Sequence, residues 1–378
     1  MLRSLAYISL VNALLLAGAA IFIFVPAPLH FLWLVGVASA ELAPLIMAAA
    51  LVLLAVPCVL LRRRLHIKLA CTTMTLAGCA AILAGLQTKS ILDFAQVLGE
   101  KISMTDCLLF KRPDGKLAAK LETKVYTRRD SGTLELDIYQ PSAAPKAHPA
   151  VVVIHGGSWR SGRRSDFAQY DLWLAGLGYT VFDLDYRLAN GKVHFPAPEE
   201  DIELGLAWIE LHALDYGVDN KRIALMGRSA GAQLALVTAY KTALAGHGKA
   251  RCVIALYGPT DLAWDYANPI EPDIIHCQEV IANYLGGPPE ALPAVYAQAS
   301  ACALVSNAAP ATLFIYGGRD QIVSRLNVDR LAPQLKEHKV SYQYLLMPWA
   351  NHGFDWHFSG LSSQLSRHAI EQFLSSHI

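Results

Sequence analysis

Hydrophobic positions are distributed unevenly along the chain. Three apolar runs, at residues 5–25, 40–61 and 69–87, hold almost no charged residue, and each is close to the ~20 residues that a helix needs to cross a bilayer. None shows the polar face of a helix on a soluble domain. A cleavable signal peptide would explain the first run but not the other two. The pattern predicts a transmembrane region of about three helices over residues 1–88.

A different pattern begins after a linker at residues 89–120. Short apolar runs alternate with helical patterns, and the β-branched run at 150–154 is typical of a strand buried on both faces. Further strands are expected at 121–127, 134–139, 180–186, 223–226, 252–257, 312–316 and 342–347. This alternation predicts an α/β domain over residues 121–378, built on a mostly parallel sheet with helices on both faces. An irregular stretch at 258–309 interrupts it.

Charge placement predicts how the chain crosses the membrane. Arg62, Arg63, Arg64 and Lys68 lie between the second and third apolar runs, and Arg3 precedes the first. Basic loops stay on the cytoplasmic side, so the N-terminus is expected there and the α/β domain on the outer (periplasmic or extracellular) face. Residues 31–61 are too short for two crossings and are interpreted as one tilted helix.

Overall composition excludes some partners. Hydrophobic residues make up 54% of the chain, charged residues only 17%, and the net charge of +1 indicates no nucleic-acid partner. The seven cysteines form no C-x-x-C pair, which argues against a zinc or redox site, and no cofactor or metal is expected. Cys277 and Cys302 lie in the irregular stretch, and a disulfide between them is left open.

The segment at residues 222–236 holds the strongest candidate for chemistry. An apolar strand pattern turns through a G-x-S-x-G motif into an Ala- and Leu-rich helix. Gly227 and Gly231 permit a bend too tight for side chains, which exposes the hydroxyl of Ser229 at its apex. The helix N-terminus favours negative charge beside this serine. Ser229 is therefore the predicted nucleophile.

Two later strands end in residues that could activate a serine. Asp320 follows the strand at 312–316, and His352 follows the last strand. An imidazole titrates near neutrality and can accept the serine proton, while a carboxylate orients the imidazole and stabilises its charged form. Asp261 is a competing acid. His357 and His368 are the alternative bases.

A glycine-rich turn follows the strand at 150–154. Backbone N–H groups can face a substrate only where no side chain blocks them, so Gly157 and Ser158, together with Ala230, are expected to bind an oxyanion. Gly156 and His155 support this turn. The alternative interpretation is a structural glycine-rich turn in which His155 only donates a hydrogen bond.

These segments together resemble the esterase/lipase branch of the α/β-hydrolases, which includes hormone-sensitive-lipase-like and feruloyl-esterase-like carboxylesterases. The resemblance covers residues 121–378 and none of the membrane region. It implies eight strands, the chain order Ser, Asp, His, and a lid, for which residues 262–305 are the candidate. The matching segments are 155–159 (HGGSW), 185–189 (DYRLA), 195–198 (FPAP), 227–231 (GRSAG), 318–320 (GRD) and 351–354 (NHGF).

The chain also departs from this family's pattern. Arg228 and Ala232 stand where such enzymes often carry an acidic residue and a further glycine. Aromatic residues of the lid candidate could line an acyl pocket or could belong to the core. These are Trp264, Tyr266, Tyr284 and Tyr296.

The leading hypothesis is a membrane-anchored serine hydrolase that cleaves a small-molecule or lipid ester through an acyl-enzyme. An acyltransferase, or an amidase or peptidase, would use the same triad. A catalytically silent binding module on a membrane anchor is the alternative from another class. The sequence leaves the oligomeric state open.

Overall fold

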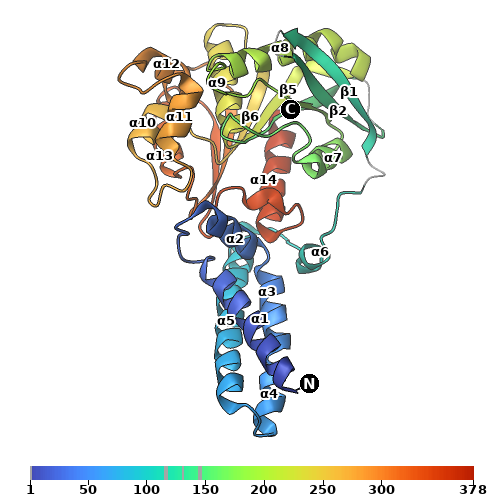
Figure 1. Ribbon diagram of the computed structural model, residues 1–378. Coiled ribbons are helices and arrows are strands. Elements are labelled where there is room, and N and C mark those ends of the chain that lie inside the picture. The colour runs from blue at the N-terminus through green and yellow to red at the C-terminus, as the bar shows by residue number, and fades with distance from the viewer. Residues whose placement is uncertain (1, 115–117, 130–131, 144–146) are drawn as a thin grey trace. The chain divides into compact units, whose positions relative to one another are not determined.

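The computed structural model describes residues 2–114, 118–129, 132–143 and 147–378. The chain divides into two compact units (Figure 1). The helical unit comprises Met1–Lys111 and Pro348–Leu365, and the sheet unit comprises Arg112–Met347 and Ser366–Ile378. The segment that follows the last strand therefore belongs to the helical unit.

Three helices of the helical unit are long and apolar enough to cross a membrane: Arg3–Ile21, Ala43–Arg62 and Ile67–Leu98. The last of them continues beyond the apolar run into the expected linker. The elements of this unit are α1 (Leu2–Ile21), α2 (His30–Glu41), α3 (Ala43–Leu53), α4 (Ala55–Arg62), α5 (Ile67–Leu98), α6 (Met104–Leu108) and η3 (Phe354–Trp356).

The middle apolar run contains one candidate span, Ala43–Arg62, but residues 31–61 do not form one continuous helix. It divides into α2, α3 and α4, with interruptions at Leu42 and Leu54. Pro44 and Pro57 lie just after these interruptions. Proline has no N–H to donate to the carbonyl four residues earlier, and its ring clashes with that carbonyl.

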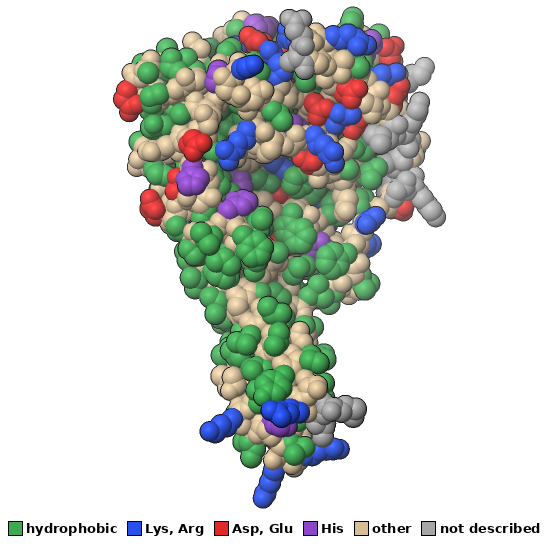
Figure 2. Space-filling model, viewed as in Figure 1, with side chains coloured by type: hydrophobic (Ala, Val, Ile, Leu, Met, Phe, Trp, Pro, Cys, Tyr) green, Lys and Arg blue, Asp and Glu red, His purple; other side chains and the backbone are tan. Residues whose placement is uncertain are grey.

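Small residues form the interior of the helical unit. Buried alanines of α1, α2, α3 and α5 form one cluster with Ile23, and large apolar side chains such as Leu15, Val52 and Ile82 point outward with exposed fractions of 66%, 75% and 64%. Figure 2 shows hydrophobic side chains over these helices, with Lys and Arg gathered near the turn between α4 and α5. Small residues between helices and large apolar residues outside are typical of membrane-spanning helices.

The sheet unit is built on one eight-stranded sheet of order β1-β2-β4-β3-β5-β6-β7-β8. The pairs β1–β2 and β2–β4 are antiparallel, and the others are parallel. The predicted α/β-hydrolase sheet is thus confirmed. The strands are β1 (Ala118–Arg129), β2 (Gly132–Pro141), β3 (His148–Ile154), β4 (Thr180–Leu184), β5 (Val218–Arg228), β6 (Ala250–Leu256), β7 (Ala311–Gly317) and β8 (Tyr342–Met347).

Helices cover this sheet, and α7, α8 and α9 pack directly on its strands (Figure 1). Consecutive residues of β3 are buried, so both faces of the sheet are covered. The helices are α7 (Ala168–Gly176), α8 (Ala197–His212), η1 (Ala213–Tyr216), α9 (Ala230–Leu244), α10 (Leu262–Ala267), α11 (Cys277–Leu285), α12 (Pro293–Gln298), η2 (Ala301–Ala303), α13 (Leu326–Glu337) and α14 (Leu361–His377), which begins in the helical unit.

The parallel strands end together at one edge of the sheet. Ile154 pairs with Gly227, and Gly317 at the end of β7 pairs with Met347 at the end of β8. Ligands of open α/β sheets bind beyond this edge. The loops that begin at these strand ends carry the residues predicted from the sequence.

Candidate active site

Ser229 occupies the turn between β5 and α9 in a strained conformation, with φ of +53° and ψ of −122°. A non-glycine residue in the left-handed region carries a conformational cost and is held there by its surroundings. A side chain at Gly227 would overlap the backbone of Gly231, and one at Gly231 would overlap the carbonyl of Ile154. The two glycines therefore permit the close approach that forms this turn.

The glycine-rich turn after β3 lies directly against the serine turn. A Cβ added at Gly156 would lie 2.9 Å from the carbonyl oxygen of Arg228 and 3.3 Å from Cβ of Ser229. Gly157 and Ser158 have φ values of +118° and +53°. The structure thus brings the predicted oxyanion segment and the predicted nucleophile into contact.

A buried glutamine fixes these two turns to each other. Gln233, one turn into α9, accepts a hydrogen bond from Nε1 of Trp159 at 2.8 Å and donates one to the carbonyl oxygen of Ala299 at 2.8 Å. Tyr284 of α11 stacks on Trp159 with a centroid distance of 4.2 Å and donates to the same Gln233 oxygen. Gln233 was not among the predicted site residues, since nothing in the motif distinguishes it from a helix-surface residue.

His155 is a structural residue of the glycine-rich turn. Its Nδ1 lies 2.7 Å from the carbonyl oxygen of Gly156 and must donate, because a carbonyl only accepts. The ring stacks on Tyr186, whose hydroxyl donates to the carbonyl oxygen of His155 at 3.0 Å. Burial lowers the pKa of His155 and keeps the imidazole neutral.

The two candidate acids have different surroundings. Oδ1 of Asp320 accepts hydrogen bonds from the backbone N–H groups of Ile322 and Val323, at 2.8 and 2.9 Å. Asp261 caps the N-terminus of α10 with one oxygen. Its other oxygen accepts from Arg330 at 2.7 Å.

The candidate bases also differ. His352 is 7% exposed, and its backbone N–H donates to Oδ1 of Asn351 at 2.8 Å. His357 packs on the ring of Phe110, and its Nε2 lies 3.2 Å from the carbonyl oxygen of Cys107. His368 lies within α14, as expected. His352 and His357 belong to the helical unit, whereas Ser229 and Asp320 belong to the sheet unit.

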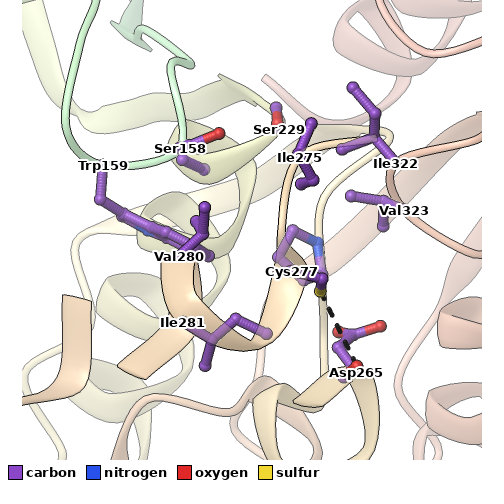
Figure 3. A pocket seen from close by; sticks show the side chains of 12 residues that line it. Ser158, Trp159, Ser229, Asp265, Ile275, Cys277, Val280, Ile281, Ile322 and Val323 are labelled. Carbon is purple, nitrogen blue, oxygen red and sulfur yellow. Dashed lines mark hydrogen bonds between the residues drawn. The ribbon is translucent and has the colours of Figure 1, made fainter. Parts of the chain in front are cut away.

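An apolar cleft of about 390 Å³, including its open mouth, lies beside the serine turn (Figure 3). Aliphatic residues of the lid candidate and of the loop after β7 line it. The four aromatic residues of the lid candidate do not: Trp264, Tyr266, Tyr284 and Tyr296. The lining residues are Ser158, Trp159, Ser229, Ala230, Pro259, Asp265, Ile275, Cys277, Val280, Ile281, Ile322 and Val323.

Asp265 is an acid at this cleft that the sequence did not indicate. Its Oδ1 accepts a hydrogen bond from Nδ2 of Asn327 at 2.8 Å. Burial raises its pKa to about 7.

Cys277 and Cys302 are free thiols. Sγ of Cys277 donates a hydrogen bond to the backbone oxygen of Asp265, and Sγ of Cys302 donates one to Oγ1 of Thr260.

Arg228, the first departure from the family pattern, is buried. Its guanidinium lies over the rings of Phe167 and Tyr170, with distances of 4.0 and 4.5 Å to the centroids. It is not among the residues that line the cleft. Its position next to the serine in the sequence therefore does not place its charge at the substrate.

The eight-stranded sheet and the strained serine turn at its edge define an α/β-hydrolase of the esterase and lipase type. Residues 136–335, more than half of the chain, match the BD-FAE protein family. The chain belongs to this family.

Curated relatives and solved structures agree with this classification. Esterase LipC of Mycobacterium tuberculosis is 29% identical over 258 residues, which cover 64% of this chain and 61% of LipC. Arylacetamide deacetylase of Bos taurus is 35% identical over 162 residues, or 41% of this chain and 40% of the relative. The chain thus spans less than two thirds of either relative. The structure of a hyperthermophilic esterase from Pyrobaculum calidifontis matches with a TM-score of 0.59 and 26% identity, over 76% of this chain and 89% of that one.

Proposed function

We propose that this protein is a membrane-anchored serine carboxylesterase. One observation carries the proposal: the strained Ser229 shares the wall of an apolar cleft with Ser158 and Ala230. A nucleophile, amide donors and a binding surface for an acyl group are the components that ester cleavage requires. Relatives named as esterases support this class of activity.

The proposed reaction proceeds through an acyl-enzyme. Oγ of Ser229 attacks the carbonyl carbon of the ester while His352 accepts the hydroxyl proton, and Asp320 stabilises the resulting imidazolium. The N–H groups of Gly157, Ser158 and Ala230 stabilise the oxyanion. The alcohol leaves with the proton from His352. Water, activated by the same imidazole, then releases the acid and regenerates the serine.

The assignment of the acid and the base rests on the strand ends and on the environment of the competitors. Asp320 lies three residues after Gly317 at the end of β7. His352 lies five residues after Met347, which ends β8 and pairs with Gly317. Asp261 is occupied as a helix cap and ion-pair partner. These observations favour Asp320 and His352 as members of the triad.

The cleft favours a compact apolar acyl group. Ile275, Val280 and Ile281 give it aliphatic walls, and small-molecule sites are lined predominantly by apolar side chains of this kind. Small esters are therefore the proposed substrates. Cleavage of an aryl amide is the second candidate, since one relative is named an arylacetamide deacetylase.

We also propose that residues 1–88 anchor the enzyme, that 89–120 form a linker and that the hydrolase domain of 121–378 lies on the outer face. Ala6, Leu60 and Ala70 pack together, so the start of α1 and the basic turn after α4 lie at the same end of the helical unit. Basic residues at one end favour that end as cytoplasmic. Protease added to spheroplasts should digest the hydrolase domain, and a protected domain would refute this orientation.

The activity is tested with a fluorophosphonate probe and p-nitrophenyl acetate on the full chain in detergent. The unaltered protein should be labelled and should hydrolyse the ester, whereas Ser229→Ala should lose both, with a rate reduction of about 10⁴-fold or more. Ser375→Ala, a change at an exposed serine of α14, is the matched control and should retain both. Labelling or hydrolysis that persists in Ser229→Ala would rule out the proposed nucleophile.

A further inference from the structure

The loop between β8 and α14, residues 348–360, is here called the histidine loop because it carries His352. It belongs to the helical unit, although it follows the last strand of the sheet. Its contacts with α2 and α5 therefore lie within one unit. These contacts join α2 and α5 to the loop that carries the proposed base.

A tryptophan of α2 holds the backbone next to His352. Nε1 of Trp33 donates a hydrogen bond to Oδ1 of Asn351 at 3.0 Å. The same oxygen accepts the backbone N–H of His352 at 2.8 Å. Trp33 is 8% exposed, so water competes little for this hydrogen bond. One amide oxygen thus links a helix near the N-terminus to the proposed base.

A second set of contacts holds Trp349, which lies two positions before Asn351 in the histidine loop. Trp349 packs edge-on against Phe94 of α5, with 5.1 Å between ring centroids. Its Nε1 donates to Oγ of Ser362 at 3.1 Å, and that hydroxyl donates to Oε1 of Glu41 at 2.8 Å. Trp349, Ser362 and Glu41 are all buried. The histidine loop is therefore held on both sides of Ala350 by side chains of α2 and α5.

We propose that Trp33 of α2 is a positioning residue that orients His352 through Asn351. This inference rests on the proposed function, in which His352 is the general base. A general base must be held within a fraction of an ångström of its productive position. The contacts of α2 with the loop meet this need and account for a helical region larger than the single span a tether requires.

The test is Trp33→Phe in the full chain, which keeps an aromatic ring but removes the N–H donor. We expect kcat for p-nitrophenyl acetate to fall about tenfold, because small displacements of catalytic groups are costly, while KM stays within about twofold. The rate of fluorophosphonate labelling should fall in parallel. Trp356→Phe, at an exposed tryptophan of the same loop, is the matched control and should leave kcat unchanged.

A double-mutant cycle shows whether Trp33 acts through Asn351. Asn351→Ala should lower kcat at least as much as Trp33→Phe, and the double variant should be no worse than Asn351→Ala alone. Multiplicative effects would mean that Trp33 acts by another route and would overturn the inference. An unchanged kcat in folded Trp33→Phe would overturn it as well.

The outcomes also separate this inference from the proposed function. If Ser229→Ala stays active, the proposed function fails whatever Trp33→Phe does. If Ser229→Ala is inactive and Trp33→Phe is fully active, only the positioning role fails. Should Trp33→Phe not fold, Ser362→Ala tests the second set of contacts, and a kcat equal to that of the unaltered protein would again overturn the inference.

Discussion

The apolar helices and the sheet are packed by different means. In the helical unit, α1, α2, α3 and α5 meet at a cluster of alanines, among them Ala20, Ala43 and Ala84, each with no exposed surface. The sheet unit buries large side chains such as Phe182 and Phe314 just as completely. In water, burial of apolar area stabilises a fold by about 25 cal/mol per Å². For the proposed transmembrane helices, lipid would provide no such driving force, and close contact of small residues would take its place.

This difference extends to the roles of glycine. In the sheet unit, Gly227 and Gly231 allow backbone segments to touch at the serine turn. In the helical unit, a Cβ at Gly18 or Gly78 would meet no atom within 4 Å. The tightest backbone contacts therefore lie where chemistry is proposed. The following predictions test this contrast.

The largest expected effect is that of Gly231→Ala. The new methyl group would overlap the carbonyl groups of Ile154 and His155. We expect a loss of about 3 kcal/mol or more in stability. Displacement of the serine turn should also reduce ester hydrolysis by about 100-fold or more. Gly78→Ala is the matched change in α5 and should lower neither the melting temperature nor the rate, because its methyl group meets no atom within 4 Å and alanine favours a helix. Equal effects of the two changes would contradict the contrast.

A smaller effect is expected from Ala84→Leu in α5. Ala84 has no exposed surface and lies in the alanine cluster, so a larger side chain should separate the helices at a cost of about 1–3 kcal/mol. Leu86→Ala, at a position that is 52% exposed on the same helix, is the control and should be tolerated. Thermal unfolding in lipid nanodiscs measures both. A tolerated leucine at position 84 would show that close packing of small residues does not stabilise this unit.

A further effect, which is spread over several pH units, concerns the sheet unit. Burial raises the pKa of Asp265 from 3.8 to about 7. The folded state therefore holds this proton more tightly than the unfolded state. The resulting stabilisation is complete below about pH 4 and is lost as pH rises toward 7, by at most about 1.4 kcal/mol per pH unit.

Asp265→Asn should flatten this dependence. Asparagine cannot ionise, and its oxygen can still accept the hydrogen bond from Asn327. Melting temperatures between pH 4 and 8 measure the effect, with the variant gaining stability relative to the unaltered protein as pH rises. Parallel pH curves for the two proteins would show that Asp265 does not ionise in this range.

Local sequence patterns were enough to predict much of the fold. The strands appeared as short apolar runs, most clearly at residues 150–154, because a strand buried on both faces needs apolar residues at successive positions. The serine turn was visible because Gly227 and Gly231 are required within five residues of each other. Asp320 and His352 were candidates because each follows a strand end, and their roles stay predictions.

Other features depended on residues far apart in the chain. The sequence left open whether the aromatic residues of the lid candidate line a pocket or belong to the core, and the cleft is lined by Ile275, Val280 and Ile281. Tyr284 instead stacks on Trp159, more than a hundred residues earlier. The pairing of Trp33 with Asn351 spans 318 residues. No periodic pattern encodes such contacts.

The sequence by itself determined the kinds of elements, the apolar runs and the serine turn, since these follow from periodicity and from the few residues that a tight bend tolerates. Only the tertiary structure decided which side chains line the cleft and which helices hold the histidine loop. The physical reason is that packing and hydrogen bonds join side chains by their positions in space, and these positions exist only after the whole chain has folded.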